Sequence, residues 1–223
     1  MLNATLRALA GAALATLSLL TAASAAPAHS HLRESMTLAA GVEALPLAAE
    51  SRDGYQRTSF KHWIDEDHDG CSTRNEVLIA ESRVPAESGP GCKILSGEWF
   101  SYYDQQTLTN PRGLDIDHMV PLAEAWDSGA SQWTAARRQA YANDLGAERS
   151  LVAVTARTNR SKADQDPAQW LPPSVDARCT YAADWVETKL RWELAADRDE
   201  ARVLREMAGG CGQQRIEYEH AQG

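Results

Sequence analysis

Asp117 and His118 are neighbours in the stretch DIDHMVP, residues 115–121, and their side chains could do chemistry together. An imidazole can take a proton from water near neutral pH, and a carboxylate can bind a hard divalent cation. Phosphodiester hydrolysis needs both properties. Adjacent strand residues point to opposite sides, so the pair can serve one site only where the strand ends or bends. Pro121 marks such an end.

A second polar group follows in SLVAVTARTNRSKAD, residues 150–164. This stretch predicts a strand and then a short helix that carries Asn159, with Arg160 and Lys162 beside it. Asn159 lies 41 residues after His118, which leaves room for a helix or loop and a returning strand. The sequence thus predicts a strand, a second strand and a helix around one cation.

Hydrophobic periodicity predicts an α+β fold around these two stretches. We expect helices at residues 55–64, 75–82, 131–144 and 156–164, with Thr155 as a helix N-cap. Residues 93–103 predict a hairpin that turns at Ser96-Gly97, and residues 114–120 and 150–155 predict strands. The tail from Cys179 to Met207 is expected to be mostly helical, with Trp185 and Trp192 as core residues.

The acidic stretch DEDHDGCSTRNE, residues 65–76, fits a calcium-binding loop. Its ligands would be Asp65, Asp67, Asp69 and Glu76, with Gly70 at the sharp turn. An alternative is a capping box formed by Thr73 and Glu76 at a helix start, beside a turn rich in side chain–backbone hydrogen bonds. Both interpretations stay open at this point.

The first 26 residues have the features of a signal peptide: Arg7, an uncharged run to Leu20 and the small-residue triplet Ala23–Ala25. Residues 27–50 are expected to be a linker or flexible arm. Loss of the leader changes the net charge from −9 to −10, because Arg7 is its one charged residue. So acidic a chain does not bind nucleic acid by bulk charge, and a nucleic-acid site must be local, with a cation in it.

The four cysteines are expected to form disulfides, because export implies an oxidising compartment. We favour the sequential pairs, Cys71 with Cys92 and Cys179 with Cys211, since each closes a local segment. A metal–thiolate site is the alternative, but no C-x-x-C spacing supports it.

The two polar stretches resemble the HNH nucleases of the ββα-metal group, including the HNH domain of the RNA-guided CRISPR nuclease. The wider chain is similar to exported bacterial HNH endonuclease-family proteins of the GmrSD type, through DGCSTRNEVL, DIDHMVPLAEAWDSGA, NRSKADQDPAQWLPP and the cysteine-bearing tail. The similarity covers most of the chain from about residue 55. It implies a ββα-metal core in one mostly helical, disulfide-stapled domain, residues 51–223.

The resemblance also implies roles for individual residues. Asp117 and Asn159 would bind Mg²⁺ or a similar cation, and His118 would be the general base. Arg160 and Lys162 would lie near the substrate phosphates. The chain departs from the family pattern where the middle Asn of HNH is expected, since residues 148–150 read Glu-Arg-Ser. Asn143 lies a few residues upstream and is a candidate substitute for holding the loop that bears His118.

These features predict a secreted, extracellular, monomeric endonuclease that cleaves DNA, with RNA as an alternative substrate. Little in the chain suggests base reading, so sequence specificity is expected to be low. No P-loop, dinucleotide fingerprint or G-x-S-x-G elbow is present in the sequence. The alternative from another class is a non-catalytic, calcium-stiffened envelope or extracellular binding module with a decayed HNH core.

Overall fold

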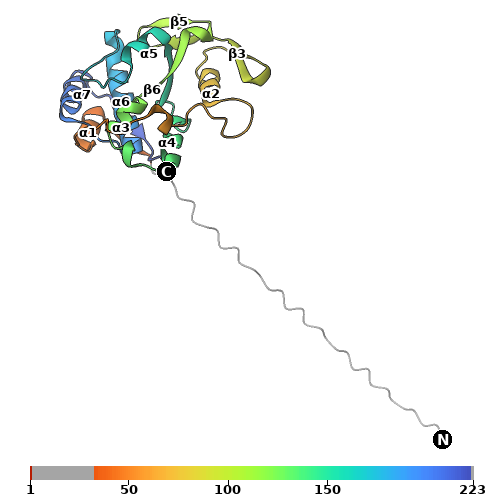
Figure 1. The fold of residues 1–223 in the computed structure, drawn as a ribbon, viewed down its shortest axis with the longest axis horizontal. Helices are drawn as coiled ribbons and strands as arrows, with labels where there is room; N and C mark the ends of the chain where they lie inside the picture. Colours follow the sequence, from red (N-terminus) through yellow and green to blue (C-terminus); the bar gives the residue numbers. More distant parts are fainter. Residues whose placement is uncertain (2–32, 222–223) are drawn as a thin grey trace. The chain divides into compact units, whose positions relative to one another are not determined.

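The computed structural model describes Met1 and residues 33–221, which form helices and four small sheets (Figure 1). The strands are β1 Glu34–Thr37, β2 Glu87–Gly89, β3 Lys93–Ser96, β4 Trp99–Ser101, β5 Gln106–Leu108, β6 Leu114–His118, β7 Leu151–Thr155 and β8 Arg215–Tyr218. The α-helices are α1 Leu38–Ala44, α2 Thr73–Ala80, α3 Leu122–Asp127, α4 Ala135–Ala142, α5 Ala156–Lys162, α6 Arg178–Trp192 and α7 Arg198–Gly210. The expected α+β class is confirmed.

Strands β6 and β7 form the antiparallel pair at the centre of the fold. Asp115 lies opposite Val154 and Asp117 opposite Val152. All five residues of β7 are buried, which explains its uninterrupted β-branched and apolar sequence. Helix α5 follows β7 without a loop and contacts β6, so the three form one strand–strand–helix unit in space, although α3 and α4 lie between β6 and β7 in the chain.

The β6–β7 pair separates two hydrophobic cores. The larger core contains Val152 and Val154 together with side chains of α1, α3, α6 and α7. The smaller core contains Leu114 and Ile116 of β6, packed with Val77 and Leu78 of α2 and with Trp99. Figure 1 shows β6 between these two sets of elements. A sheet covered on both faces holds the polar residues of β6 in a fixed place.

Helix α5 begins and ends at residues whose chemistry explains its bounds. The Thr155 hydroxyl accepts a hydrogen bond from the backbone N–H of Thr158, which confirms Thr155 as the N-cap. The helix ends at Ala163, whose φ of 50° lies in the left-handed region that stops helix growth. This short helix presents Asn159, Arg160 and Lys162 towards β6.

Three expectations for the described residues are wrong. Residues 34–44, expected in a linker or flexible arm, form β1 and α1, so the folded unit begins before residue 51; β1 pairs with β8, and Leu38 and Val42 are buried. Residues 55–64 contain only a 3₁₀ turn, Arg57–Ser59. Residues 93–103 are not one hairpin: β3 pairs with β2, and β4 pairs with β5.

The expected helices near residues 75–82, 131–144 and 156–164 and in the tail are present, with shifted ends. Both expected disulfides are also present, Cys71–Cys92 and Cys179–Cys211. The first joins the acidic stretch to the start of β3, and the second joins α6 to the end of α7. Each closes a loop of a few tens of residues, which stabilises by about 3–4 kcal/mol in the chain-entropy account.

The expected signal peptide lies outside the described residues. Within residues 33–221, no helix combines the length and the apolar character needed to cross a membrane.

A buried ammonium group joins the three helices α3, α6 and α7. Lys189 Nζ lies 2.6 Å from Glu200 Oε2 and 2.9 Å from Glu124 Oε1, and all three side chains are at most 3% exposed. The Ser128 hydroxyl and the Ala195 carbonyl oxygen complete its surroundings. Glu200 also accepts from the Trp185 indole N–H. This network satisfies buried charges that would otherwise oppose folding.

We expect Lys189→Met to lower the free energy of unfolding by about 3–5 kcal/mol, because Glu124 and Glu200 would stay buried without their cation. Chemical denaturation of the purified variant measures the loss. Lys93→Met, a change at an exposed lysine, is the matched control and should stay within about 0.5 kcal/mol of the parent. A Lys189→Met protein as stable as this control would show that the network does not hold the helices together.

Candidate active site

Asp115 and Asp117 lie two residues apart on β6, so both carboxylates face α5. They meet different partners there. Asp115 is partly exposed and meets Asn159 and Arg160, whereas Asp117 is 4% exposed and meets Lys162. The site therefore has an outer half and a buried half, both built between β6 and α5.

The buried half is centred on the Asp117 carboxylate. Its Oδ2 accepts hydrogen bonds from the Tyr103 hydroxyl at 2.6 Å and from Lys162 Nζ at 2.5 Å. Its Oδ1 has no hydrogen-bond partner in the described part of the chain. Burial raises the pKa of Asp117 and lowers the pKa of Lys162, while the ion pair opposes both shifts.

Lys162 cannot contact a substrate phosphate as expected. Its side chain is 0% exposed, and Nζ donates to Asp117 Oδ2, to the His118 carbonyl oxygen at 3.1 Å and to the Met119 carbonyl oxygen at 2.7 Å. These three bonds use all three ammonium protons. Lys162 instead fixes the end of β6 on α5.

The outer half consists of Asp115, Asn159 and Arg160. Asp115 Oδ2 lies 3.1 Å from Arg160 Nε and 3.5 Å from Asn159 Nδ2. The Arg160 side chain is 74% exposed, so this ion pair is weak and the guanidinium is free to move to a phosphate. Arg160 thus lies where a nucleic-acid backbone could reach it.

His118 ends β6 and faces away from the Asp117–Lys162 pair. Its Nε2 lies 3.0 Å from the Ala142 carbonyl oxygen, and its ring centroid lies 5.2 Å from that of Trp63. A carbonyl oxygen can only accept, so Nε2 carries the ring proton and Nδ1 keeps its lone pair. Burial lowers the pKa of His118 to about 3, so the imidazole is neutral at physiological pH.

Trp63 covers His118 from a strained backbone position. Its φ of 58° places a bulky residue in the left-handed region, which needs support from its surroundings. Asn143 supplies part of that support: its amide donates to the Lys61 carbonyl oxygen at 2.8 Å and accepts from the Ile64 N–H at 3.1 Å. Asn143 therefore holds the segment that packs on His118, whereas the loop that bears His118 is held by Ser150, whose carbonyl oxygen accepts from the Met119 N–H at 3.0 Å.

The oxygen donors between β6 and α5 fit a hard divalent cation. Asp117 Oδ1 is unpartnered within the described structure, Asp115 is paired only with exposed or weak partners, and rotation of the Asn159 amide would present its oxygen. Carboxylate and amide oxygens are the ligands that Mg²⁺ prefers. Asp115, Asp117 and Asn159 are thus the residues suited to hold such an ion.

Asp115 and Tyr103 were missed in the sequence. Asp115 could have been found from its spacing to Asp117, because alternate residues of a strand share a face. Nothing local marked Tyr103, which is fully buried and reaches Asp117 from the segment after β4.

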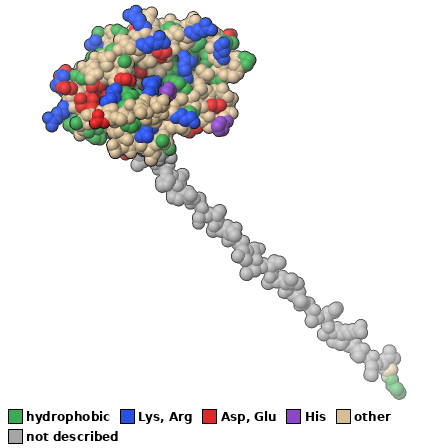
Figure 2. All heavy atoms as spheres, viewed as in Figure 1, with side chains coloured by type: hydrophobic (Ala, Val, Ile, Leu, Met, Phe, Trp, Pro, Cys, Tyr) green, Lys and Arg blue, Asp and Glu red, His purple; other side chains and the backbone are tan. Residues whose placement is uncertain are grey.

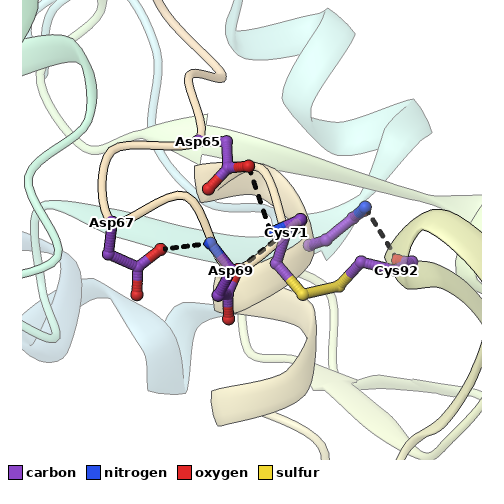
Figure 3. The surroundings of a disulfide bond; sticks show 7 residues. Asp65, Asp67, Asp69, Cys71 and Cys92 are labelled. Atoms are coloured by element: carbon purple, nitrogen blue, oxygen red, sulfur yellow. Dashed lines mark hydrogen bonds between the residues drawn. A yellow bond between two sulfur atoms is a disulfide. The ribbon is translucent and has the colours of Figure 1, made fainter.

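The acidic loop before α2 is a separate cluster (Figure 3). Carboxylate oxygens of Asp65, Asp67 and Asp69 lie within 4.8 Å of one another. Asp65 Oδ2 accepts from the Gly70 N–H at 3.1 Å, where Gly70 has a φ of 94°. Thr73 does not cap α2 through Glu76, since Ser72 is the N-cap residue and makes no side-chain cap bond. Burial raises the pKa of Glu76, and the carboxylates of Asp67, Asp69 and Asp65 add to the shift.

Charged side chains are mixed over the face seen in Figure 2. Lys and Arg are spread across it, while several Asp and Glu gather at its left edge, where Figure 1 places α1 and α7. This face carries no basic patch of the kind that binds nucleic acid by charge alone.

Comparison with known proteins identifies relatives of the chain. Residues 75–207 match the family described as GmrSD restriction endonucleases, C-terminal domain. An uncharacterized secreted protein of the fungus Arthroderma benhamiae is 41% identical over 160 residues, which cover 72% of this chain and 77% of the relative. This relative is fungal, so the expected bacterial origin is not confirmed. No solved structure matches. The matched residues include β6, β7 and α5, and the chain belongs to the GmrSD restriction endonuclease C-terminal domain family.

Proposed function

We propose that the chain is a secreted, metal-dependent endonuclease that hydrolyses phosphodiester bonds of DNA with low sequence specificity. The observation that carries the proposal is that Asp115 and Asp117 both face α5 from β6, where Asp115 meets Asn159 and Asp117 meets Lys162, with His118 next in the chain. Family membership supports the same class of reaction. In this proposal β6, β7 and α5 are a ββα-metal core.

The mechanism assigns one task to each side chain. His118 Nδ1 takes the proton from a water molecule as the water oxygen adds to phosphorus and the bond to the leaving sugar oxygen breaks. Arg160 holds a phosphate oxygen by charge and hydrogen bonds. Lys162 and Tyr103 keep Asp117 oriented. A bound Mg²⁺-class ion would neutralise charge that develops on the phosphate and the leaving oxygen.

A secreted relative and two disulfides support an extracellular site of action. The relative is described as secreted, and both disulfides of this chain suit an oxidising compartment. A phosphodiester hydrolase in that compartment meets DNA released from other cells, and RNA is the alternative substrate.

One observation favours the other class, a non-catalytic binding module. His118 is only 6% exposed, because Trp63 and Tyr141 pack against its ring. Cleavage requires that a water molecule and a phosphate reach this imidazole. The enzyme proposal therefore needs direct measurement of turnover, and plasmid digestion with Mg²⁺, with and without EDTA, decides between the two classes.

We propose in addition that the acidic loop binds Ca²⁺ and stiffens the segment before α2. The supporting observation is Asp65 Oδ1, a buried oxygen with no hydrogen-bond partner in the described structure. Asp67 and Asp69 belong to the same metal-spaced group, and Glu76 is proposed as a further ligand because Ca²⁺ prefers several carboxylate oxygens.

His118→Ala should remove most plasmid-nicking activity while the protein stays folded. Loss of a general base costs on the order of 10²- to 10⁴-fold in rate. His220→Ala, at an exposed histidine, is the control and should cleave like the parent. Nicking by His118→Ala at the parental rate, in protein free of contaminating nuclease, would show that His118 is not the base.

Arg160→Ala and Lys162→Met should have opposite phenotypes. Arg160→Ala should weaken DNA binding and leave stability unchanged. The slope of the logarithm of the binding constant against the logarithm of the salt concentration should fall by about one. Lys162→Met should cost about 3–5 kcal/mol of stability, because Asp117 would remain buried without its cation. Filter binding across salt concentrations and chemical denaturation measure the two effects, with exposed Arg157→Ala as control. A Lys162→Met protein that is as stable as the parent but binds DNA more weakly would show that Lys162 contacts the substrate.

An Asp67→Ala/Asp69→Ala variant should bind one Ca²⁺ fewer per chain than the parent. Its melting temperature should also rise less when Ca²⁺ is added. It should keep Mg²⁺-dependent cleavage wherever it stays folded, because the loop is separate from the β6–α5 site. Glu66→Ala, an exposed change within the same loop, is the control. A folded loop variant that cannot cleave at any Mg²⁺ concentration would place the acidic loop in the active site.

A further inference from the structure

Five carboxylates converge at a third place, apart from the acidic loop and the β6–α5 site. Their oxygens form two groups in which all members lie within 4.8 Å of one another. One group joins Glu50 with Asp166 and Asp197, and the other joins Glu50 with Glu124 and Asp127. Glu50 belongs to both and is the centre of this cluster, called here the Glu50 cluster.

The chain brings the Glu50 cluster together from four distant segments. The segment before Glu50 is held by the bridge between Leu47 and Ala196 and by the bond from the Ala48 N–H to the Ala196 carbonyl oxygen at 3.0 Å. Asp197 follows Ala196 directly. Glu124 and Asp127 lie on α3, and Asp166 lies in the turn after α5.

Most of these carboxylates have one oxygen fixed by the protein and one left over. Asp166 Oδ1 accepts from two backbone N–H groups, at 2.7 and 3.0 Å, and Asp197 Oδ1 accepts from the Glu200 N–H at 2.7 Å as the N-cap of α7. Glu124 Oε1 binds Lys189, and Asp127 Oδ2 binds Arg52 at 2.6 Å. The side chains are thus held in place with a free oxygen each.

Two of the free oxygens are buried without any hydrogen-bond partner in the described residues, Glu50 Oε1 and Asp127 Oδ1. The Asp127 side chain is only 5% exposed, and Asp166 and Glu124 are 3% and 2% exposed. A buried carboxylate oxygen without a partner is costly, so such groups are rare unless a ligand or water satisfies them. In each group of the Glu50 cluster, one oxygen of every member lies within 4.8 Å of the others.

The charges of the Glu50 cluster do not balance. Five carboxylates meet two cations, Arg52 and Lys189, and Lys189 is shared with Glu200. Arg52 is 47% exposed and also reaches towards Asp164 at 3.8 Å, so it neutralises the cluster only in part. The excess negative charge and the oxygen-only donor set suit a hard cation.

We propose that the Glu50 cluster binds one hard divalent cation of the Ca²⁺ class, which fastens the segment around Glu50 to α3, to the turn after α5 and to the start of α7. Many carboxylate oxygens and few open positions favour Ca²⁺ over Mg²⁺, which keeps several waters. The ion is structural, and its binding does not depend on nuclease activity.

Isothermal titration of the EDTA-treated full chain with CaCl₂ tests the proposal, in the Asp67→Ala/Asp69→Ala background that silences the acidic loop. Adding Glu50→Gln should remove one equivalent of Ca²⁺ and the matching rise in melting temperature. Asp199→Asn, which neutralises an 80%-exposed carboxylate two residues after Asp197, should remove neither.

Loss of one bound Ca²⁺ in Glu50→Gln supports the site only if the Asp199→Asn protein still binds that Ca²⁺. Equal Ca²⁺ stoichiometry and melting shift in the parent background and in Glu50→Gln would overturn the proposal, as would a background protein that binds no Ca²⁺. Asp166→Asn keeps the fixed Oδ1 and changes only the free position. It serves as a second variant if Glu50→Gln does not fold. An Asp166→Asn protein that binds as much Ca²⁺ as the background protein would also overturn the proposal.

Discussion

The buried ion pair of Asp117 and Lys162 determines how the motif residues are arranged. Lys162 also binds the carbonyl oxygens of His118 and Met119, so one ammonium group fixes both a side chain and the backbone at the end of β6. Because α5 carries this lysine, the helix has one position relative to the strand, and Asn159 and Arg160 are placed beside Asp115. A hydrophobic contact would allow sliding, whereas three directed hydrogen bonds in a water-free space do not.

The interior relies on charge to an unusual degree for a chain of this size. Lys162 and Lys189 are both fully buried, and the Arg191 guanidinium lies 2.8 Å from Asp144 under little solvent exposure. Each cation joins elements that are distant in sequence and has more than one acceptor. Within the described residues the sheets are all two-stranded, and only α6 and α7 are longer than 8 residues, so the fold has few long, regular interfaces. Buried pairs and two disulfides give it the specificity that a larger sheet supplies elsewhere.

The residues that could be predicted from the sequence are those whose partners are near in the chain. The strands β6 and β7, the Thr155 cap of α5 and both disulfides depend on patterns of a few residues or on local loops. The segment 55–64 looked helical because Phe60 and Trp63 have suitable spacing, but Asn143 holds it in an irregular path from far along the chain. Lys162 was expected near the substrate phosphates, and its burial could not be predicted for the same reason: its partners, Asp117 and the Tyr103 ring, lie over 40 residues away.

The pairing of β1 with β8 bears on the order in which the protein can fold. Glu34 lies opposite Tyr218 and Thr37 opposite Arg215, and Gly41 of α1 packs so closely on Ile216 that a Cβ would lie 2.2 Å from its terminal methyl. This sheet and the contact beside it cannot form until residue 218 has been synthesised. Strand β1 therefore stays unpaired until β8 is available. Such long-range closure slows folding.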